Sequence, residues 1–358
     1  MKILFDCRYT RFPRHDGISR YTARLVEELA RLHPVTMMIH DERQLPMLPD
    51  LPWVKGPHAR GPLEPLAALF VNRFRPDVVF SPMQTIGPWG RRYTLVTTVH
   101  DLIYYRHRTP PRNLAWPVRL IWRAYHLTWF FQRRLLRNAD AHLTDSHTTR
   151  ALLAEHELSE RPVTVVWLGT DLPARTPVRP LPATRDLVYM GSFMPYKNVD
   201  LLVRGMRLLP EHRLHVVSGI DAAERARLES LRGEGDVVFH DGIDDEAYRP
   251  LLAGAVALVS ASRDEGFGLP IVEAMAEGTP VVVSDIPIFR ETAADAGGFF
   301  DPDSPESFAA AVRELDDARV WHARSVAAAE RSRGFDWAEA ARTLLEVLTE
   351  THRRRVGG

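Results

Sequence analysis

Short apolar runs alternate with segments of helical periodicity along the first half of the chain. Tyr21, Leu25, Val26 and Leu29 recur at helical spacing and predict a helix over residues 19–32. Apolar runs bounded by turn residues are typical of buried parallel strands. The predicted strands are 2–5, 35–39, 78–81, 95–99, 141–144 and 163–166, with further helices over 63–74 and 146–156. This alternation predicts a parallel sheet with helices on both faces.

The same alternation resumes after a proline-rich stretch. Pro173, Pro177, Pro180 and Pro182 lie close together, which is typical of a linker. The second series has predicted strands at 186–190, 215–218, 237–240, 256–259, 280–283 and 299–301, and helices at 199–208, 222–231, 305–315 and 320–331. The pattern predicts two Rossmann-like α/β domains, at 1–172 and 173–336. A last amphipathic segment begins at residue 337 and has no strand after it, so the pattern alone allows it to pack on either domain.

Composition narrows the class of protein. A chain of 358 residues exceeds one ordinary hydrophobic core, and its formal net charge of zero gives no indication of nucleic-acid binding. Cys7 is the one cysteine, which excludes an internal disulfide and fits a reducing compartment. The first residues reach Asp6 too soon for a signal peptide, and no run approaches the roughly 20 apolar residues of a spanning helix. Because of the single cysteine, the early acidic residue and the lack of a long apolar run, we expect a cytoplasmic location. The histidines show no H-x-x-x-H pair, so we expect no metal site.

The most informative stretch runs from Ser262 to Gly278, just after the predicted strand 256–259. Gly266 and Gly268 let the backbone approach a ligand closely, and Pro270 suits the first turn of a helix that Gly278 would end. A glycine loop opening into a helix at the carboxyl end of a strand is where open α/β sheets bind anions.

Glu265 and Glu273 flank this predicted anion site. Carboxylates beside a phosphate cradle favour hydroxyl ligands, so sugar hydroxyls and phosphate together indicate a nucleotide sugar. The alternative is a pair of solvated or helix-capping carboxylates.

Three further segments contain candidate binding residues after predicted strands. Lys197, one of three lysines, follows the strand 186–190 and suits a diphosphate; the alternative is a solvated lysine. His100 and Asp101 follow the strand 95–99 and would contact sugar hydroxyls or the acceptor, unless the histidine is merely hydrogen-bonded at a strand end. Gly17 could offer its N–H to a phosphate or be only a turn glycine.

Residues 112–137 hold six arginines and no acidic residue, together with Trp116, Trp122, Trp129, Phe130 and Phe131. We favour a helix that packs its aromatic face onto the sheet. The alternative is a basic amphipathic helix on an anionic membrane surface.

Taken together, these motifs resemble the family-4 retaining glycosyltransferases, whose GT-B fold has two Rossmann-like domains facing each other across a cleft. The resemblance covers nearly the whole length, and its most specific piece is Glu265 to Pro270 through Glu273 to Ala276. The other matching residues are Gly17, His100-Asp101, Asp145-Ser146, Gly169-Thr170-Asp171 and Tyr196-Lys197-Asn198. The resemblance implies that segment 337–358 is a C-terminal helix that crosses back to the first domain.

The resemblance also implies roles for these residues. The glutamate that holds the donor ribose falls on Glu273, and the one at the donor sugar falls on Glu265. The amides between them would meet the sugar hydroxyls and the diphosphate: those of Gly266, Phe267, Gly268 and Leu269. Lys197 matches the phosphate-binding lysine.

In the first domain, Gly17 matches the loop that approaches the diphosphate, His100 matches a residue near the sugar 6-position, and Asp101 would lie on the acceptor side. We therefore expect Glu265, His100 and Lys197 to form the catalytic set. Many members have an arginine soon after Gly191, where this chain has Ser192, so the second phosphate cation is unassigned.

The implied activity is transfer of a hexose, with retained configuration and without a metal or other cofactor, by front-face attack of the acceptor. The His-Asp-Leu and Tyr-Lys-Asn forms favour mannose from GDP-mannose, with UDP-sugars close behind. The expected acceptor is a glycan, glycolipid or small molecule, and lipid linkage and contact with the inner membrane face are left open. The alternatives are a non-catalytic nucleotide-sugar binding protein and a GT-B epimerase or phosphorylase; a phosphorylase should carry a late lysine, and none follows Lys197.

Overall fold

The computed structural model describes the chain except for residues 60, 111–113, 176–178 and 358. The chain divides into two compact units. The first unit comprises Met1–Pro110, Leu114–Gly169 and Asp336–Gly358, and the second comprises Thr170–Phe335. Pro177 of the predicted linker and Arg112 of the predicted basic segment lie outside the described residues.

The first unit is built on a seven-stranded sheet in the order β3-β2-β1-β4-β5-β6-β7, in which every pair of neighbours is parallel. The strands are β1 (Ile3–Asp6), β2 (Val35–Ile39), β3 (Trp53–Lys55), β4 (Val78–Ser81), β5 (Thr94–Val99), β6 (Ala141–Thr144) and β7 (Val163–Val165). Ile3 of β1 pairs with Val35 on one side and Val78 on the other. The sequence pattern missed β3, because this short edge strand exposes two of its three residues and shows no apolar run.

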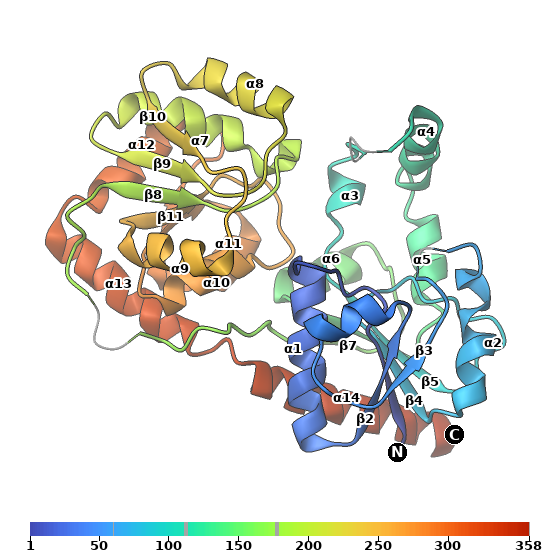
Figure 1. Cartoon of the computed structure of the whole chain (residues 1–358). Helices are drawn as coiled ribbons and strands as arrows, with labels where there is room; N and C mark the ends of the chain where they lie inside the picture. Colours follow the sequence, from blue (N-terminus) through green and yellow to red (C-terminus); the bar gives the residue numbers. More distant parts are fainter. Residues whose placement is uncertain (60, 111–113, 176–178, 358) are drawn as a thin grey trace. The chain divides into compact units, whose positions relative to one another are not determined.

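Helices cover this sheet as the alternation predicts (Figure 1). They are α1 (Gly17–Leu32), η1 (Glu42–Met47), η2 (Glu64–Leu66), α2 (Ala67–Val71), η3 (Asn72–Phe74), α3 (Ile103–Arg106), α4 (Trp116–Tyr125), α5 (Phe130–Leu136), α6 (His147–Glu155) and α14 (Trp337–Gly357). The helix predicted over 63–74 is present as a short α-helix with a 3-10 turn at each end.

The second unit is built on a six-stranded parallel sheet in the order β10-β9-β8-β11-β12-β13. Its strands are β8 (Asp186–Tyr189), β9 (Arg213–Val216), β10 (Asp236–Phe239), β11 (Ala257–Ser260), β12 (Val281–Ser284) and β13 (Gly297–Phe300). Its helices are η4 (Pro195–Lys197), α7 (Val199–Gly205), η5 (Met206–Leu208), α8 (Ala222–Arg232), α9 (Asp245–Gly254), α10 (Leu269–Ala276), α11 (Pro287–Ala293), η6 (Ala294–Ala296), α12 (Pro305–Glu314) and α13 (Ala318–Ser332). Two parallel sheets confirm the predicted α/β fold class.

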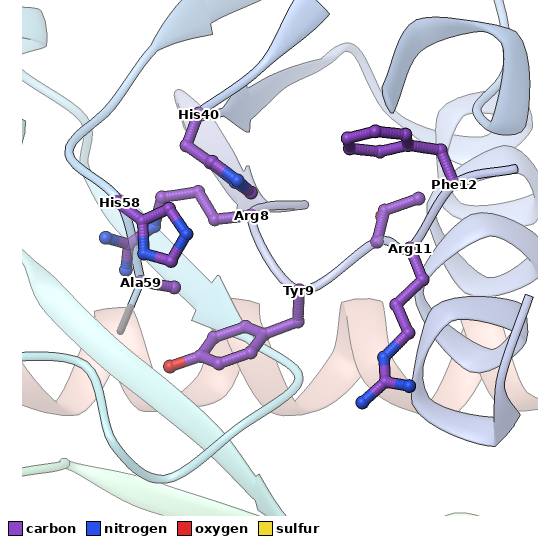
Figure 2. Close-up of a pocket in the computed structure, with 8 residues that line it drawn as sticks. Arg8, Tyr9, Arg11, Phe12, His40, His58 and Ala59 are labelled. Carbon is purple, nitrogen blue, oxygen red and sulfur yellow. The ribbon is translucent and has the colours of Figure 1, made fainter. Parts of the chain in front are cut away.

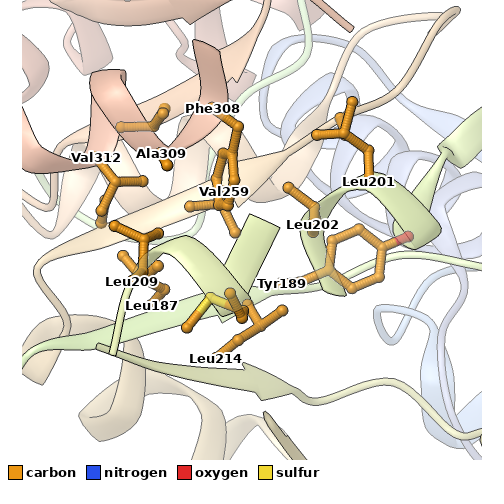
Figure 3. Packing of buried hydrophobic residues seen from close by; sticks show 14 of the residues in the cluster. Leu187, Tyr189, Leu201, Leu202, Leu209, Leu214, Val259, Phe308, Ala309 and Val312 are labelled. Atoms are coloured by element: carbon orange, nitrogen blue, oxygen red, sulfur yellow. The ribbon is translucent and has the colours of Figure 1, made fainter. Parts of the chain in front are cut away.

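The core of the second unit shows why its strands are continuous apolar runs. Parallel strands covered on both faces bury every side chain, and all four residues of β11 and of β12 are buried. Leu202 of α7 and Phe308 of α12 pack with Val259 of β11 in one cluster (Figure 3). The indole Nε1 of buried Trp321 donates to the carbonyl of Val256 at 2.9 Å, which satisfies the one polar atom of that side chain.

The C-terminal helix α14 belongs to the first unit, as the resemblance implies. It packs along α1 and against β4 and β5 (Figure 1). Near its start, a Cβ added to Gly169 would lie 2.4 Å from the backbone nitrogen of Trp337, so the chain passes there only without a side chain. Near its end, His352 Nδ1 lies 3.1 Å from Thr94 Oγ1.

The basic aromatic segment differs from the favoured prediction. We expected a helix packing its aromatic face onto the sheet, but none of the residues of α4 is buried. The helix is held by its neighbours instead: Trp122 lies edge-on to Tyr104 at 5.2 Å and Tyr125 stacks on Phe131 at 5.0 Å. An aromatic pattern at helical spacing does not say whether the aromatic face meets a sheet or the solvent.

Candidate active site

The predicted donor residues follow the two strands at which the second sheet reverses its order. Strands β9 and β10 follow β8 on one side of the sheet. The next strand, β11, pairs with the other side of β8. Ligands of open α/β sheets bind at this switch point, beyond the carboxyl ends of the strands. Lys197 lies in the loop after β8, and Glu265 lies in the loop after β11.

Lys197 and Glu265 meet in an ion pair between Nζ and Oε1. Their side chains are only 14% and 15% exposed, so water screens the pair weakly. Ser262 Oγ donates to the same carboxylate oxygen at 3.3 Å. The backbone N–H of Arg263 donates to the carbonyl of Tyr196 at 2.7 Å, which holds the two loops together. Two residues 68 positions apart thus share one site.

The glycine loop opens into α10 as the sequence predicts. Gly268 is the N-cap, with φ of +98°, and Pro270 lies in the first turn; no side chain caps this end of the helix. Gly278 follows the helix with φ of +69°. Such positive φ values favour glycine.

Phe267 lies in the same loop, but its side chain points into the protein. The ring is 5% exposed and lies edge-on to Phe335 at 5.6 Å. Its carbonyl accepts a hydrogen bond from Thr292 Oγ1 at 3.0 Å. Phe267 therefore anchors the loop.

Glu273 lies on α10 among buried apolar neighbours, with 8% of its surface exposed. Neither it nor Glu265 caps the helix, because Gly268 is the N-cap and no side-chain cap is present. The solvated and helix-capping alternatives for these two glutamates therefore do not describe their surroundings.

The predicted residues of the first unit have a different character. His100 follows β5, and its Nδ1 lies 2.6 Å from Asp145 Oδ2 while its Nε2 lies 2.7 Å from the carbonyl oxygen of Pro82. When Asp145 is ionised both neighbours are acceptors, so the geometry favours the form of His100 with a proton on each ring nitrogen. Burial opposes this charge, but the Asp145 carboxylate outweighs burial and raises the pKa of His100.

This arrangement matches the alternative of a histidine hydrogen-bonded at a strand end. A sugar hydroxyl could reach a nitrogen of His100 only by replacing Pro82 or Asp145 as its partner. Asp101 accepts a hydrogen bond from the N–H of Ile103 at 3.0 Å, at the start of α3. Gly17 is exposed as the first residue of α1.

A buried ion network at the end of β1 was not predicted from the sequence. Arg8 donates to both oxygens of Asp6 at 2.7 and 2.9 Å and to both oxygens of Glu64 at 2.6 and 3.0 Å. The two carboxylates raise the pKa of Arg8 against the effect of burial. The sequence did contain a signal for this network: an acidic and a basic residue, Asp6 and Arg8, lie two positions apart at the end of an apolar run.

A pocket of about 180 Å³ lies beside this network (Figure 2). It is lined by Tyr9 and Arg11 of the loop after β1 and by His40 and His58, whose rings lie edge-on at 4.5 Å. Buried Thr10 also lines it. Within the described residues, Thr10 Oγ1 and His40 Nδ1 are buried without a hydrogen-bond partner.

Two family models match the chain, one to each unit. Residues 15–173 match the model described as glycosyltransferase family 4, and residues 184–317 match the model described as glycosyl transferases group 1. The chain is a glycosyltransferase, with a family 4 domain in its first unit and a group 1 domain in its second. As a glycosyltransferase, it binds a nucleotide-sugar donor and a sugar acceptor.

Curated relatives of this glycosyltransferase include two proteins named O-antigen chain mannosyltransferases. That of Salmonella typhimurium, RfbU, is 25% identical over 259 residues, which are 68% of this chain and 72% of the relative. Mannosyltransferase B of Escherichia coli is 27% identical over 377 residues, covering 94% of this chain and 96% of the relative. A D-inositol 3-phosphate glycosyltransferase of Streptomyces griseus is 32% identical, over 47% of this chain and 40% of the relative.

Solved structures show the same GT-B fold. Sucrose-phosphate synthase from Thermosynechococcus elongatus matches with a TM-score of 0.75 and 22% identity, covering 98% of each chain. Anabaena HepE in complex with UDP-glucose matches with a TM-score of 0.70 and 18% identity, covering 98% of this chain and all of that one.

Neither a candidate metal site nor a membrane-spanning helix is present among the described residues of the glycosyltransferase. No group of three or more His, Cys, Asp and Glu side chains there could hold a metal ion. No helix in the same part of the chain is long and apolar enough to cross a membrane.

Proposed function

We propose that the chain transfers mannose, with retained anomeric configuration, from GDP-mannose to a sugar-containing acceptor. The observation that carries the donor assignment is the convergence of Lys197 and Glu265 at the switch point of the second sheet. A cation, a carboxylate and the open start of α10 suit a diphosphate joined to a sugar. The names of the two O-antigen relatives favour mannose over other hexoses.

In this proposal each residue binds one part of the donor. Lys197 binds the diphosphate, the amides of residues 266–269 bind phosphate and sugar oxygens, and Glu273 binds the ribose. Glu265 contacts the sugar and stabilises the positive charge that develops in the transition state. Lys197 supplies one cation to the diphosphate, and we propose, as the family resemblance implies, that the reaction uses no metal.

The reaction breaks the bond between C1 of the sugar and the diphosphate oxygen and forms a bond from C1 to the acceptor oxygen on the same face. The acceptor proton passes to the departing diphosphate, so GDP leaves carrying it. Glu265 need not attack, and no second carboxylate is required, in contrast to retaining glycosidases.

For the acceptor we propose a glycan, and we extend this to lipid-linked glycans of polysaccharide biosynthesis on the basis of the same relatives. On the first unit, Tyr9, Arg11 and His58 line the pocket of Figure 2 with side chains that can hydrogen-bond to hydroxyl groups. We assign this pocket, with Asp101, to the acceptor side. The cytoplasmic location stays a prediction from the single cysteine.

The test is release of nucleoside diphosphate from a panel of nucleotide sugars with glycan acceptors present, followed by NMR of the product's anomeric configuration. We expect acceptor-dependent release of GDP from GDP-mannose and an α-linked product. Faster release of UDP from a UDP-sugar would overturn the donor assignment, and inverted configuration would overturn the mechanism. A donor that binds without any release would favour the binding-protein alternative, and interconversion of the free donor would favour an epimerase.

A further inference from the structure

Helix α4 turns an apolar face to the solvent. Trp116 is 73% exposed, Ile121 is 71% exposed and Leu120 is 54% exposed. On a helix, positions 116, 120 and 124 share a face with 117 and 121, and in this chain these five residues are Trp, Leu, Ala, Pro and Ile. Amphipathic helices of globular proteins turn such a face toward the core, so the reversed orientation requires a partner outside the unit.

The apolar face continues beyond the helix. Leu127 and Phe130 are exposed by 58% and 64%. Figure 1 shows α3, α4 and α5 projecting from the sheet of the first unit. We call the exposed side chains of Trp116, Leu120, Ile121, Leu127 and Phe130 the apolar patch.

Positive charge surrounds this patch. From Leu102 to Ala139 the sequence holds eight arginines and no aspartate or glutamate. Arg119 and Arg123 lie one helical turn apart on α4, beside the Trp116 edge of the patch. No ion pair among the described residues involves Arg119, Arg123, Arg134 or Arg137, so their charges are available to an anionic partner.

The other side of α4 is occupied by its own unit, which fixes the orientation of the helix. Trp122 packs on His126 at 4.0 Å, and Tyr105 stacks on Trp129 at 4.4 Å. The aromatic residues that face inward are therefore distinct from those of the apolar patch, and the patch is not a core face left open by chance.

We propose that the apolar patch and its arginines bind the surface of a membrane that contains anionic lipids. Apolar and aromatic side chains enter the boundary between headgroups and acyl chains, while arginines at its edge pair with lipid phosphates. A charged protein partner would not require so wide an apolar face, and a second copy of the chain would bring arginines against arginines. Membrane binding itself does not depend on the proposed function. Only its purpose does, because binding would hold the enzyme beside a lipid-linked acceptor.

The test is co-sedimentation of the full chain with vesicles of phosphatidylcholine alone and of phosphatidylcholine with phosphatidylglycerol. We expect binding to the anionic vesicles that weakens as salt is added. The triple variant Trp116→Ser, Leu120→Ser, Ile121→Ser should weaken partitioning by about 100-fold, because three exposed apolar side chains are lost. The double variant Arg119→Gln, Arg123→Gln should weaken it by about 30-fold at low salt.

Trp89 provides a matched control, because it is 72% exposed on the same unit and lies outside the patch. Trp89→Ser should bind vesicles as the unaltered chain does. No residue of α4 is buried, so the triple variant should keep its melting temperature and its stabilisation by GDP. That second readout separates failure of the membrane proposal from failure of the proposed function.

Absence of binding to anionic vesicles, or binding that the triple variant retains, would overturn the proposal. A chain that dimerises in solution, and loses the dimer but no vesicle binding in the triple variant, would make the patch an interface between copies. If Trp89→Ser lost as much vesicle binding as the triple variant, the binding would be general adsorption of exposed apolar side chains, which would likewise contradict the proposal.

Discussion

The ammonium group of Lys197 lies against the carboxylate of Glu265 at the carboxyl edge of the second sheet. Each of the two groups that we assign to the donor is therefore the partner of the other. A diphosphate that binds Lys197 competes with Glu265, and the released carboxylate becomes available to the sugar. Donor binding in our proposal thus exchanges one ion pair for another.

Lys197→Ala should weaken binding of GDP by about 10- to 100-fold, because a hydrogen bond to a charged group contributes roughly 1.5–3 kcal/mol. Isothermal titration with GDP measures this. Lys55→Ala is the matched control, since Lys55 is exposed and pairs only loosely with Glu42 at 3.4 Å. Equal affinities of the two variants for GDP would contradict the assignment of Lys197.

Glu265→Gln should separate binding from transfer. The substitution removes the carboxylate that competes for Lys197, so GDP should bind at least as tightly as it does to the unaltered chain. Transfer should fall by about 100-fold or more if Glu265 stabilises the charged sugar in the transition state. Titration and steady-state kinetics on one preparation check both parts, and a variant that lost GDP affinity in step with turnover would show that Glu265 only shapes the loop.

Glu273→Ala should abolish detectable stabilisation by GDP while the protein remains folded. A carboxylate that accepts hydrogen bonds from two ribose hydroxyls contributes to nucleotide binding. Without it, GDP should no longer raise the melting temperature. Glu277→Ala, just past the end of the same helix, is the control and should retain the shift. Undiminished affinity of Glu273→Ala for GDP would remove the ribose assignment.

Apolar runs predicted the strands of the second unit, most clearly β11 and β12, in which every residue is buried. The sequence also placed Lys197 and Glu265 after strand ends and Glu273 on the helix that follows the glycine loop, since the apolar runs and the turn residues mark these positions. It could not show the ion pair between the first two, because they are 68 residues apart and only the sheet order brings their loops together.

The features that were not predicted from the sequence lack a recognisable hydrophobic pattern or motif. Strand β3 is short and mostly exposed, and the pocket beside β1 draws on His40 and His58 from separate loops. The orientation of α4 could not be read either, because periodicity shows that a face is apolar without showing what it meets.

Gly268→Ala should destabilise the second unit by about 1–2 kcal/mol, because φ at this position is +98° and an L residue is strained there. An added Cβ would also approach Ile271 Cδ1 to 3.1 Å. Thermal unfolding checks this, with an expected fall of roughly 3–6 °C in melting temperature. Gly219→Ala is the control, since a Cβ there has no neighbour within 4 Å; a fall of the same size in both variants would show that backbone strain at Gly268 is not the cause.

The contact between His100 and Asp145 predicts how the stability of the first unit depends on pH. Asp145 raises the pKa of His100 above its ordinary value of 6.5, against the effect of burial. A group whose pKa is raised by folding stabilises the protein fully below its unfolded pKa, and that contribution is lost as the pH rises through the folded pKa. The pair should therefore stabilise the unit most at mildly acidic pH.

Asp145→Asn tests this dependence, because it removes the carboxylate and leaves the shape of the side chain nearly unchanged. Near pH 6 the substitution should cost about 3–5 kcal/mol, since it leaves His100 buried with its charge unpaired or forces it to lose its proton. At a pH far enough above 6.5 for His100 of the unaltered chain to lose its proton, the cost should be clearly smaller, because the ion pair then disappears. Chemical unfolding of both chains at the two pH values measures the difference, followed by a probe in the first unit. A cost that is the same at both would show that the contact is a neutral hydrogen bond and that His100 carries no charge.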